Sequence, residues 1–518
     1  GRVIPVLTLA DPPVSNAREA RAQADAGKLV VLMIGNIHAG EVDGKEGLPI
    51  LAREIISQPD HPLLKNMVLV FAPIFNCDGN ERVSKDNRPG QHGPDEGMGI
   101  RENAAGLDLN RDFVKLESPE DRALVKFIND WDPAIFVDTH TTNGSYHQYA
   151  VTYEGPRHPA GDQTLIEYVR DTMFPAVSKD LEAKAGLKTF YYGDFNKEHT
   201  RWDSFPLQPR FTTNYMGLRG RISILSEGYS YSSYKERVLG TRDFVRTCLE
   251  FASTNKDHIR KLLADADRRT IDLGRNPPKD PKPEQQLAVR SKAAKAPETM
   301  KAAGFVEEVR DGKTISTGEK KDYDVEVWNR GEPDMLVPRV YAYIIPQPLV
   351  SGLSRAVETL QRHGIEVEEL REDIELDIEA CKVTQVARSP QEFQKHNTAR
   401  VDAERRAESR MIPAGSIVVR TGQKLGHLAS MLLEPASDDG LVTWNFFDDT
   451  LAIGKDFPVL RVPAATHLHT TAIRPLRDES FVQESLSYKR VHESDRGVNL
   501  GGNPSGGGAW IDDDTWRV

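Results

Sequence analysis

The sequence predicts an α/β protein whose main sheet is covered by helices on both faces. Over residues 1 to about 268, apolar runs of strand character alternate with helical patterns. Polar residues stand at the ends of several of these runs, where open α/β sheets bind ligands. A chain of 518 residues exceeds one ordinary core, so we also expect a second, smaller α/β or α+β domain.

The expected strands of the first part are short and rich in Val, Ile, Leu and Phe. They span residues 3–9, 29–36, 67–73, 134–139 and 220–226. The expected helices span residues 42–57, 118–130, 163–186 and 234–265. This alternation predicts strands whose connecting helices pack on both faces of one sheet.

A polar, Pro-rich stretch beginning Asn276-Pro-Pro-Lys-Asp-Pro-Lys-Pro283 has the composition of a linker. After it, residues 322–328 alternate with the period of a strand, and residues 339–370 predict a strand, helix, strand unit. We therefore predict a first domain (1–270), a linker rich in Pro, Lys and Ala (271–300), an accessory domain (301–475) and an extended Gly-rich tail (476–518).

Composition limits the classes of function. The formal charge of -11 gives no support for nucleic-acid binding, which calls for a basic surface. Three scattered cysteines argue against a disulfide framework, and the apolar stretches are too short for a membrane span. The chain starts at Gly1 instead of Met, so we expect a missing N-terminal segment that could carry an export signal. The compartment therefore stays open.

A metal-binding set is predicted at two strand ends. His38 and Glu41 form a His-x-x-Glu motif directly after the apolar run Val31–Gly35. His140 ends a second run, Ala134-Ile-Phe-Val-Asp-Thr-His140. Catalytic zinc usually takes three protein ligands and leaves one position for water. Two imidazoles and one carboxylate would provide such a site.

Other hydrolase patterns are absent from the sequence. There is no His-Glu-x-x-His, and Val42 after Glu41 breaks the inverted pattern His-x-x-Glu-His. A serine nucleophile elbow requires a second glycine that the stretch around Ser230 lacks.

A polar cluster lies between the two ligand segments: Arg101-Glu-Asn-Ala-Ala, then Gly106-Leu-Asp-Leu-Asn-Arg-Asp-Phe113. With the His-x-x-Glu motif, the later histidine and the opening Gly1-Arg-Val-Ile-Pro-Val-Leu-Thr-Leu9, this order resembles the zinc metallocarboxypeptidase (funnelin) family over about residues 1–255. The resemblance implies a mixed, twisted sheet flanked by helices and one zinc ion per chain, bound by His38, Glu41 and His140.

The resemblance also implies roles for further residues. Asn110 and Arg111 would grip a substrate's terminal carboxylate, as a planar guanidinium can. Asp108 would orient the first metal-binding histidine, and Arg101, with Arg88 as its rival, would stabilise the oxyanion. Glu227, at the end of the strand at 220–226, would be the catalytic base. Tyr215 is the nearest upstream candidate for the family's mobile, substrate-closing tyrosine.

We therefore expect a zinc-dependent carboxypeptidase that hydrolyses the C-terminal peptide bond with metal-activated water. Its partner would be a peptide or acyl amino acid with a free carboxylate. Two alternatives stay open. One is a related zinc amidohydrolase acting on acyl amino acids or cell-wall peptides, and the other is a peptidase-like binding protein without turnover.

Overall fold

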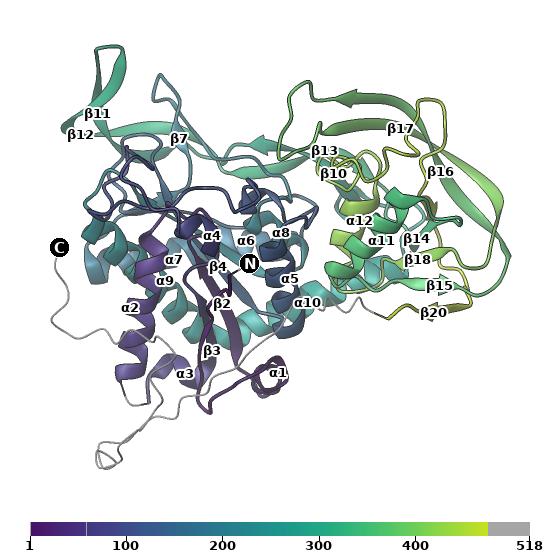
Figure 1. Ribbon diagram of the computed structural model, residues 1–518, viewed down its shortest axis with the longest axis horizontal. Helices are drawn as coiled ribbons and strands as arrows, with labels where there is room; N and C mark the ends of the chain where they lie inside the picture. The colour runs from purple at the N-terminus through teal and green to yellow at the C-terminus, as the bar shows by residue number, and fades with distance from the viewer. Residues whose placement is uncertain (1, 59, 475–518) are drawn as a thin grey trace. The chain divides into compact units, whose positions relative to one another are not determined.

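The computed structural model describes residues 2–58 and 60–474. A seven-stranded sheet forms its first part (Figure 1). Its strand order is β1 (Leu7–Leu9), β3 (Met67–Ala72), β2 (Leu29–Gly35), β4 (Ile135–Thr142), β9 (Ile222–Tyr229), β5 (Val151–Glu154) and β6 (Thr189–Tyr191). Strands β3, β2, β4 and β9 run parallel to one another, whereas β1 and β5 join them antiparallel. The predicted fold class, a mixed sheet with helices, is confirmed.

Alternate residues of the central strands enter two different cores. Val31 and Met33 of β2 pack with one set of helices, and Val30 and Leu32 pack on the opposite face. The first set is α2 (Asp43–Ser57), α3 (Pro62–Asn66), α6 (Gln163–Glu167), α7 (Phe174–Ala185), α9 (Tyr234–Thr254) and α10 (Lys256–Arg275). The opposite face is covered by α1 (Ala17–Asp25), α5 (Pro119–Trp131) and α8 (Thr212–Leu218).

Local chemistry explains where the elements depart from the predicted ranges. The helix expected over 163–186 contains a π-helical turn, Tyr168–Met173, directly before Pro175. Proline has no N–H to donate to the preceding turn, and π turns occur where the hydrogen-bond ladder is interrupted. The helix expected over 234–265 is two helices that meet at Asn255. Strand β4 extends to Thr142, so His140 lies inside the strand.

The chain after α10 builds mainly antiparallel sheets. One pairs β10 (Leu287–Ala294) with β13 (Arg330–Val337). Another has the order β11 (Met300–Arg310), β12 (Lys313–Trp328), β8 (Arg201–Asp203) and β7 (Asp194–Phe195). The third has the order β17 (Ala399–Ile412), β16 (Ile374–Arg388), β19 (Leu460–Val462), β14 (Ala342–Ile345), β18 (Ile417–Arg420), β15 (Glu368–Leu370) and β20 (Thr470–Ala472). Its helices are α11 (Ser351–Arg362) and α12 (Gly426–Leu433); short helical turns elsewhere are α4 (Cys77–Asn80), η1 (Leu109–Arg111) and η3 (Pro283–Gln285).

The predicted linker requires a correction. Helix α10 continues to Arg275, and β10 lies inside the predicted range 271–300. Leu287, Ala288 and Val289 of this strand are buried, so their apolar character outweighs the polar residues around them. The described residues belong to one compact unit, and the predicted boundary between two domains stays a prediction. The tail expected at 476–518 lies outside the described residues.

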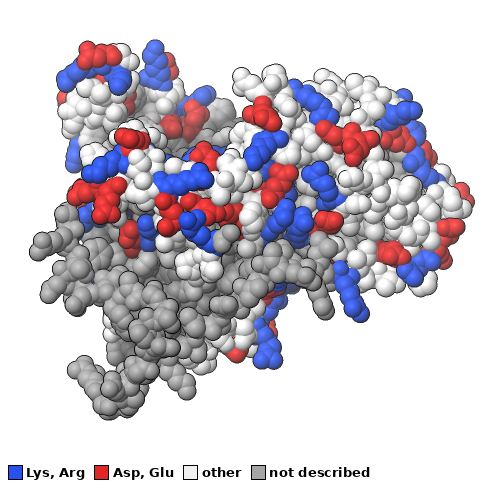
Figure 2. Space-filling view, in the orientation of Figure 1, with Lys and Arg blue, Asp and Glu red and all other residues white. Residues whose placement is uncertain are grey.

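Charges of both signs are interspersed on the face that Figure 2 shows. Among the described residues, no helix combines the length and apolarity that crossing a membrane requires.

Candidate active site

The loop after β2 places His38 and Glu41. Asn36 adopts a left-handed conformation with φ of 65°, which asparagine tolerates better than most residues. Its side-chain Nδ2 donates to the carbonyl of Ala39 at 2.9 Å, and the N–H of Glu41 donates to the carbonyl of His38 at 2.8 Å. This tight turn directs the imidazole and the carboxylate toward the same point.

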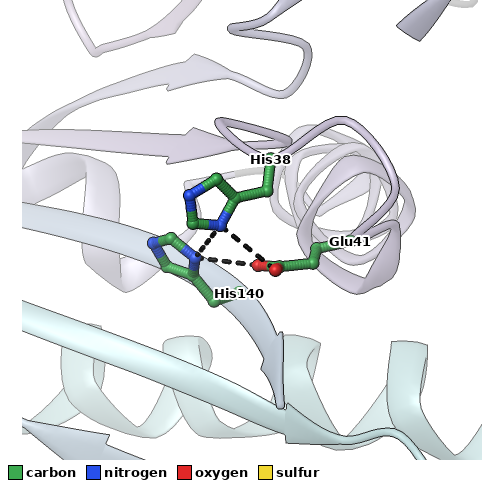
Figure 3. Close-up of side chains that lie close together, drawn as sticks. All are labelled: His38, Glu41 and His140. Atoms are coloured by element: carbon green, nitrogen blue, oxygen red, sulfur yellow. Dashed lines mark hydrogen bonds and ion pairs between the residues drawn. The ribbon is translucent and has the colours of Figure 1, made fainter. Parts of the chain in front are cut away.

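His140 meets this pair from the neighbouring strand β4 (Figure 3). Its Nδ1 lies 2.8 Å from Glu41 Oε2 and 3.2 Å from His38 Nδ1, while His38 Nδ1 lies 3.1 Å from Glu41 Oε1. All three residues are buried, and one potential ligand atom from each lies within 4.8 Å of the others. The structure therefore brings together the three predicted ligands in a group that could hold a metal ion.

The outer nitrogens of both imidazoles contact carboxylates. His38 Nε2 lies 3.0 Å from Asp108 Oδ1, and His140 Nε2 lies 2.9 Å from Asp138 Oδ2. A metal-binding histidine usually donates the N–H of its other ring nitrogen to such a partner. This fixes the tautomer and leaves the lone pair of the inner nitrogen free to bind the metal. The two Nδ1 atoms face each other in this structure, so the donor set and its surroundings fit a zinc ion.

Glu41 is held by cations as well as by the histidines. Burial opposes its ionisation, but the charges of His38 and Arg88 and the contacts with both imidazoles hold the pKa of Glu41 well below its usual value. Arg88 NH2 lies 2.8 Å from Glu41 Oε1, and Arg101 NH1 lies 3.6 Å from the same oxygen. Arg101 also donates from Nε to Asp108 Oδ2 at 2.8 Å. Both rivals for the oxyanion role thus border the site.

Glu227 lies beside His140, because the two are register partners on the adjacent parallel strands β9 and β4. Its side chain is buried. Burial raises the pKa of Glu227 to about 8, with Glu41 and Asp138 adding to the effect and His140 and Arg101 opposing it. A carboxyl with a raised pKa next to a metal site suits proton transfer near neutral pH.

Asn110 and Arg111 follow Asp108 in the short helical turn η1. The Asn110 side-chain oxygen accepts from the N–H of Thr212 at 3.0 Å, and its Nδ2 lies 3.4 Å from His140 Nε2. The Arg111 guanidinium lies 4.4 Å above the ring of Phe211, and its side chain is 22% exposed. Arg111 therefore borders the site with donors open to solvent.

The prediction for Tyr215 requires a correction. Tyr215 is fully buried in helix α8, where its ring packs against Phe113. Its hydroxyl contacts His363 Nδ1 at 2.8 Å and accepts from Arg219 at 3.1 Å. These contacts commit the side chain to the core, so it cannot close over a substrate at the site.

Two residues near the site were not assigned from the sequence. Asp138 precedes His140 by two positions, which puts both side chains on one face of β4, and this spacing could have revealed it. Tyr192 follows β6, and burial raises the pKa of its phenol, with the negative charge of Glu227 contributing. No pattern around Tyr192 indicates that it lies near Glu227.

Residues 1–199 match the family described as zinc carboxypeptidase. The predicted resemblance to zinc carboxypeptidases is confirmed. The match supports a peptidase hydrolase. The matched range contains His38, Glu41, Asp108 and His140, whereas Glu227 lies beyond it.

Proteins with related sequences carry carboxypeptidase names. Carboxypeptidase 2 of Trichophyton tonsurans is 22% identical over 492 residues, covering 89% of this chain and 81% of its own. Carboxypeptidase D of Mus musculus is 34% identical over an alignment of 138 residues that covers 23% of this chain and 10% of that protein. Among solved structures, a metallo-carboxypeptidase from Burkholderia cenocepacia is 17% identical, with a TM-score of 0.36, covering 49% of this chain and 62% of that one.

Proposed function

We propose that this protein is a zinc-dependent carboxypeptidase that removes the C-terminal residue of peptides. The observation that carries the proposal is the convergence of His38, Glu41 and His140 on one point, with Glu227 beside them on the next strand. A structural role alone does not require two buried imidazoles whose inner nitrogens face each other and whose outer nitrogens each contact a carboxylate.

Zinc held by these three side chains would activate water and polarise the scissile carbonyl group. Glu227 would accept a proton from the attacking water and deliver it to the leaving amine, because its carboxyl lies beside His140 on the adjacent strand. Arg101 and Arg88 both lie beside Glu41, where their guanidinium groups would stabilise negative charge that develops on the carbonyl oxygen.

Arg111 would select substrates with a free terminal carboxylate. Stacking on Phe211 restrains the guanidinium plane, and Asp108 lies 3.9 Å from its NH1. A guanidinium can bind a carboxylate through two parallel hydrogen bonds, which favours recognition of a chain end over an internal peptide bond.

The test compares peptides that differ only at the C-terminus. We expect the zinc-loaded protein to release the last residue from a peptide acid much faster than from the matching amide. Replacing Arg111→Ala should lower kcat/KM for the acid about 10- to 100-fold, as loss of a charge-assisted hydrogen bond does, and should affect the amide much less. Arg268→Ala, an exposed arginine on α10, is the matched control.

An equal rate for acid and amide in the wild-type protein would contradict the carboxypeptidase proposal. Hydrolysis of acyl amino acids without any peptide turnover would instead favour an amidohydrolase.

A further inference from the structure

The turn that joins β16 to β17 reaches the loop that carries Asp108, Asn110 and Arg111. We call residues 389–398 the hairpin tip. Three of its side chains contact this loop in succession: Gln394 Oε1 accepts from the Asp108 N–H at 2.9 Å, Lys395 Nζ donates to the Ala105 carbonyl at 2.7 Å, and His396 Nε2 lies 2.9 Å from Glu117 Oε2. The contacts join segments almost 300 positions apart in the sequence.

The backbone of the hairpin tip is strained at the two residues that make the first contacts. Gln394 and Lys395 have φ angles of 52° and 64°, and Phe393 and His396 exchange backbone hydrogen bonds of 2.8 and 3.0 Å on either side. Positive φ at both central residues is the requirement of a type I′ turn, for which Asn-Gly is strongly preferred. Gln-Lys is a poor choice for the turn itself, and both long side chains are used to contact the loop.

The N–H of Asp108 depends on a contact from outside the loop. Neighbouring N–H groups bond within the loop, as Asn103 does to the Leu107 carbonyl and Arg111 to the Asp108 carbonyl. Asp108 is buried, and its N–H would lack an acceptor without Gln394. The side chain of the same residue contacts His38 and Arg101, and Arg111 lies three positions further on. A shift of Asp108 would therefore move the groups that border the site.

A second contact joins the hairpin tip to the segment that carries Phe211. Phe393 in the hairpin tip lies 5.4 Å below the guanidinium of Arg210, which is also paired with the buried Asp439. Arg210 precedes Phe211, the ring on which Arg111 stacks. The C-terminal part of the chain thus supports both the loop of Arg111 and its aromatic partner.

We propose that the hairpin tip is a positioning element of the active site, with Gln394 and Lys395 holding the loop so that Arg111 is ready to receive a substrate carboxylate. This inference rests on the proposed carboxypeptidase function. It assigns a role to the C-terminal part of the chain, which would hold in place the loop that binds the substrate carboxylate.

The decisive variant is the double substitution Gln394→Asn with Lys395→Gly. Asn-Gly relieves the backbone strain of the type I′ turn and removes both contacts with the loop. If the turn had only a structural role, this variant would be more stable than the wild type. We expect an unchanged or higher melting temperature, unchanged zinc content, and KM for a peptide acid raised about fivefold, as loss of one or two hydrogen bonds implies, with kcat within about twofold. Gln391→Met, on the exposed side of the hairpin tip, is the control and should match the wild type.

A normal KM in the folded double variant would overturn the proposal, and so would a KM that rises only together with loss of zinc or melting temperature. Amide hydrogen exchange over residues 103–112 gives a readout that needs no turnover. Faster exchange in the double variant supports positioning even if the wild-type protein fails to prefer peptide acids, which would count against the proposed function alone. Unchanged exchange would overturn positioning whatever the substrate is.

Discussion

At the scale of single residues, each metal-site imidazole is held at both ring nitrogens. The inner nitrogens of His38 and His140 face Glu41, and their outer nitrogens contact Asp108 and Asp138. These carboxylates fix the ring orientation that zinc binding requires. The sequence motifs predict the candidate ligands because their spacing is short and regular. The two-residue spacing of Asp138 and His140 also indicates a shared face, provided that the strand continues through His140, as β4 does.

Replacing Asp138→Asn should weaken zinc binding about 10- to 100-fold, because the amide is a weaker partner for the imidazole N–H than the carboxylate is. Competition with a chelator of known affinity measures this change. Asp180→Asn, in an exposed ion pair on α7, should bind zinc like the wild type. Equal zinc affinity in Asp138→Asn would show that this carboxylate does not orient His140.

Tyr192 and Tyr215 show the limit of prediction for single residues. Tyr215 was chosen by its distance along the chain from Glu227, yet helix α8 turns it into the core. Tyr192 reaches the neighbourhood of Glu227 because β5, β6 and β9 lie in one sheet. Both outcomes depend on tertiary packing, which sequence spacing does not report.

At the scale of elements, helix α2 lies unusually close to strand β4. A Cβ at Gly44 would overlap Thr139 Oγ1, so only glycine allows this approach. The Thr139 hydroxyl is fixed by a 2.8 Å hydrogen bond to the Ile34 carbonyl and cannot easily move. Glu41 lies three residues before Gly44, so this contact sets the distance between Glu41 and His140.

Gly44→Ala should therefore force α2 away from the sheet, lower the free energy of unfolding by about 1–3 kcal/mol and weaken zinc binding. Gly240→Ala on α9 is the matched control, since its nearest neighbouring atom would lie 3.8 Å away. The control should be neutral or stabilising by up to about 1 kcal/mol, because alanine favours helices. Chemical denaturation and zinc titration of both variants check this, and a harmless Gly44→Ala would refute the packing argument.

His363, at the end of α11, links two parts of the chain in its neutral form. Its Nε2 donates to the Val114 carbonyl at 3.0 Å, and its Nδ1 lies 2.8 Å from the Tyr215 hydroxyl. Burial lowers the pKa of His363 to about 3, whereas in the unfolded chain it is about 6.5. As pH falls below about 6.5, the unfolded state binds a proton that the folded state does not, so stability decreases.

Between these two pKa values, protonation of this residue should lower the free energy of unfolding by up to about 1.4 kcal/mol for each unit by which the pH falls. His363→Gln should be less stable than the wild type at pH 7, and the difference between them should shrink at pH 5. Urea denaturation at both pH values measures it. A difference independent of pH would mean that His363 is not kept neutral by the fold.

The main strands and helices of the first part could be predicted because they have long apolar patterns of clear period. The sequence does not predict the very short strands β7 and β8 or the strand β10. Two or three residues carry no measurable period, and β10 follows a Pro-rich stretch whose composition suggested a linker. Their pairing partners, such as β12 for β8, lie more than a hundred residues away.

At the scale of the whole molecule, one hydrophobic core crosses the predicted domain boundary. Phe113 and Tyr215 of the first part share a buried cluster with Tyr343, Leu360 and Trp444. Apolar burial of this kind is the main driving force of folding, so the two parts should stabilise each other.

A fragment ending at Arg275 would expose this shared core. We expect it to aggregate or to unfold well below the melting temperature of the full chain, which should unfold in one cooperative transition. Calorimetry of both proteins tests this. A fragment that melts at the temperature of the full chain would establish the predicted independent first domain.

The central claim is that Glu227 acts beside a zinc ion held by His38, Glu41 and His140. Its most direct test measures zinc content and release of the C-terminal residue from a peptide acid for the wild type and Glu227→Gln. We predict one zinc per chain in both proteins and a kcat lower by about 10²- to 10⁴-fold in the variant, the usual contribution of a general base. Wild-type turnover in Glu227→Gln, or a wild-type protein that turns over without zinc, would contradict the account.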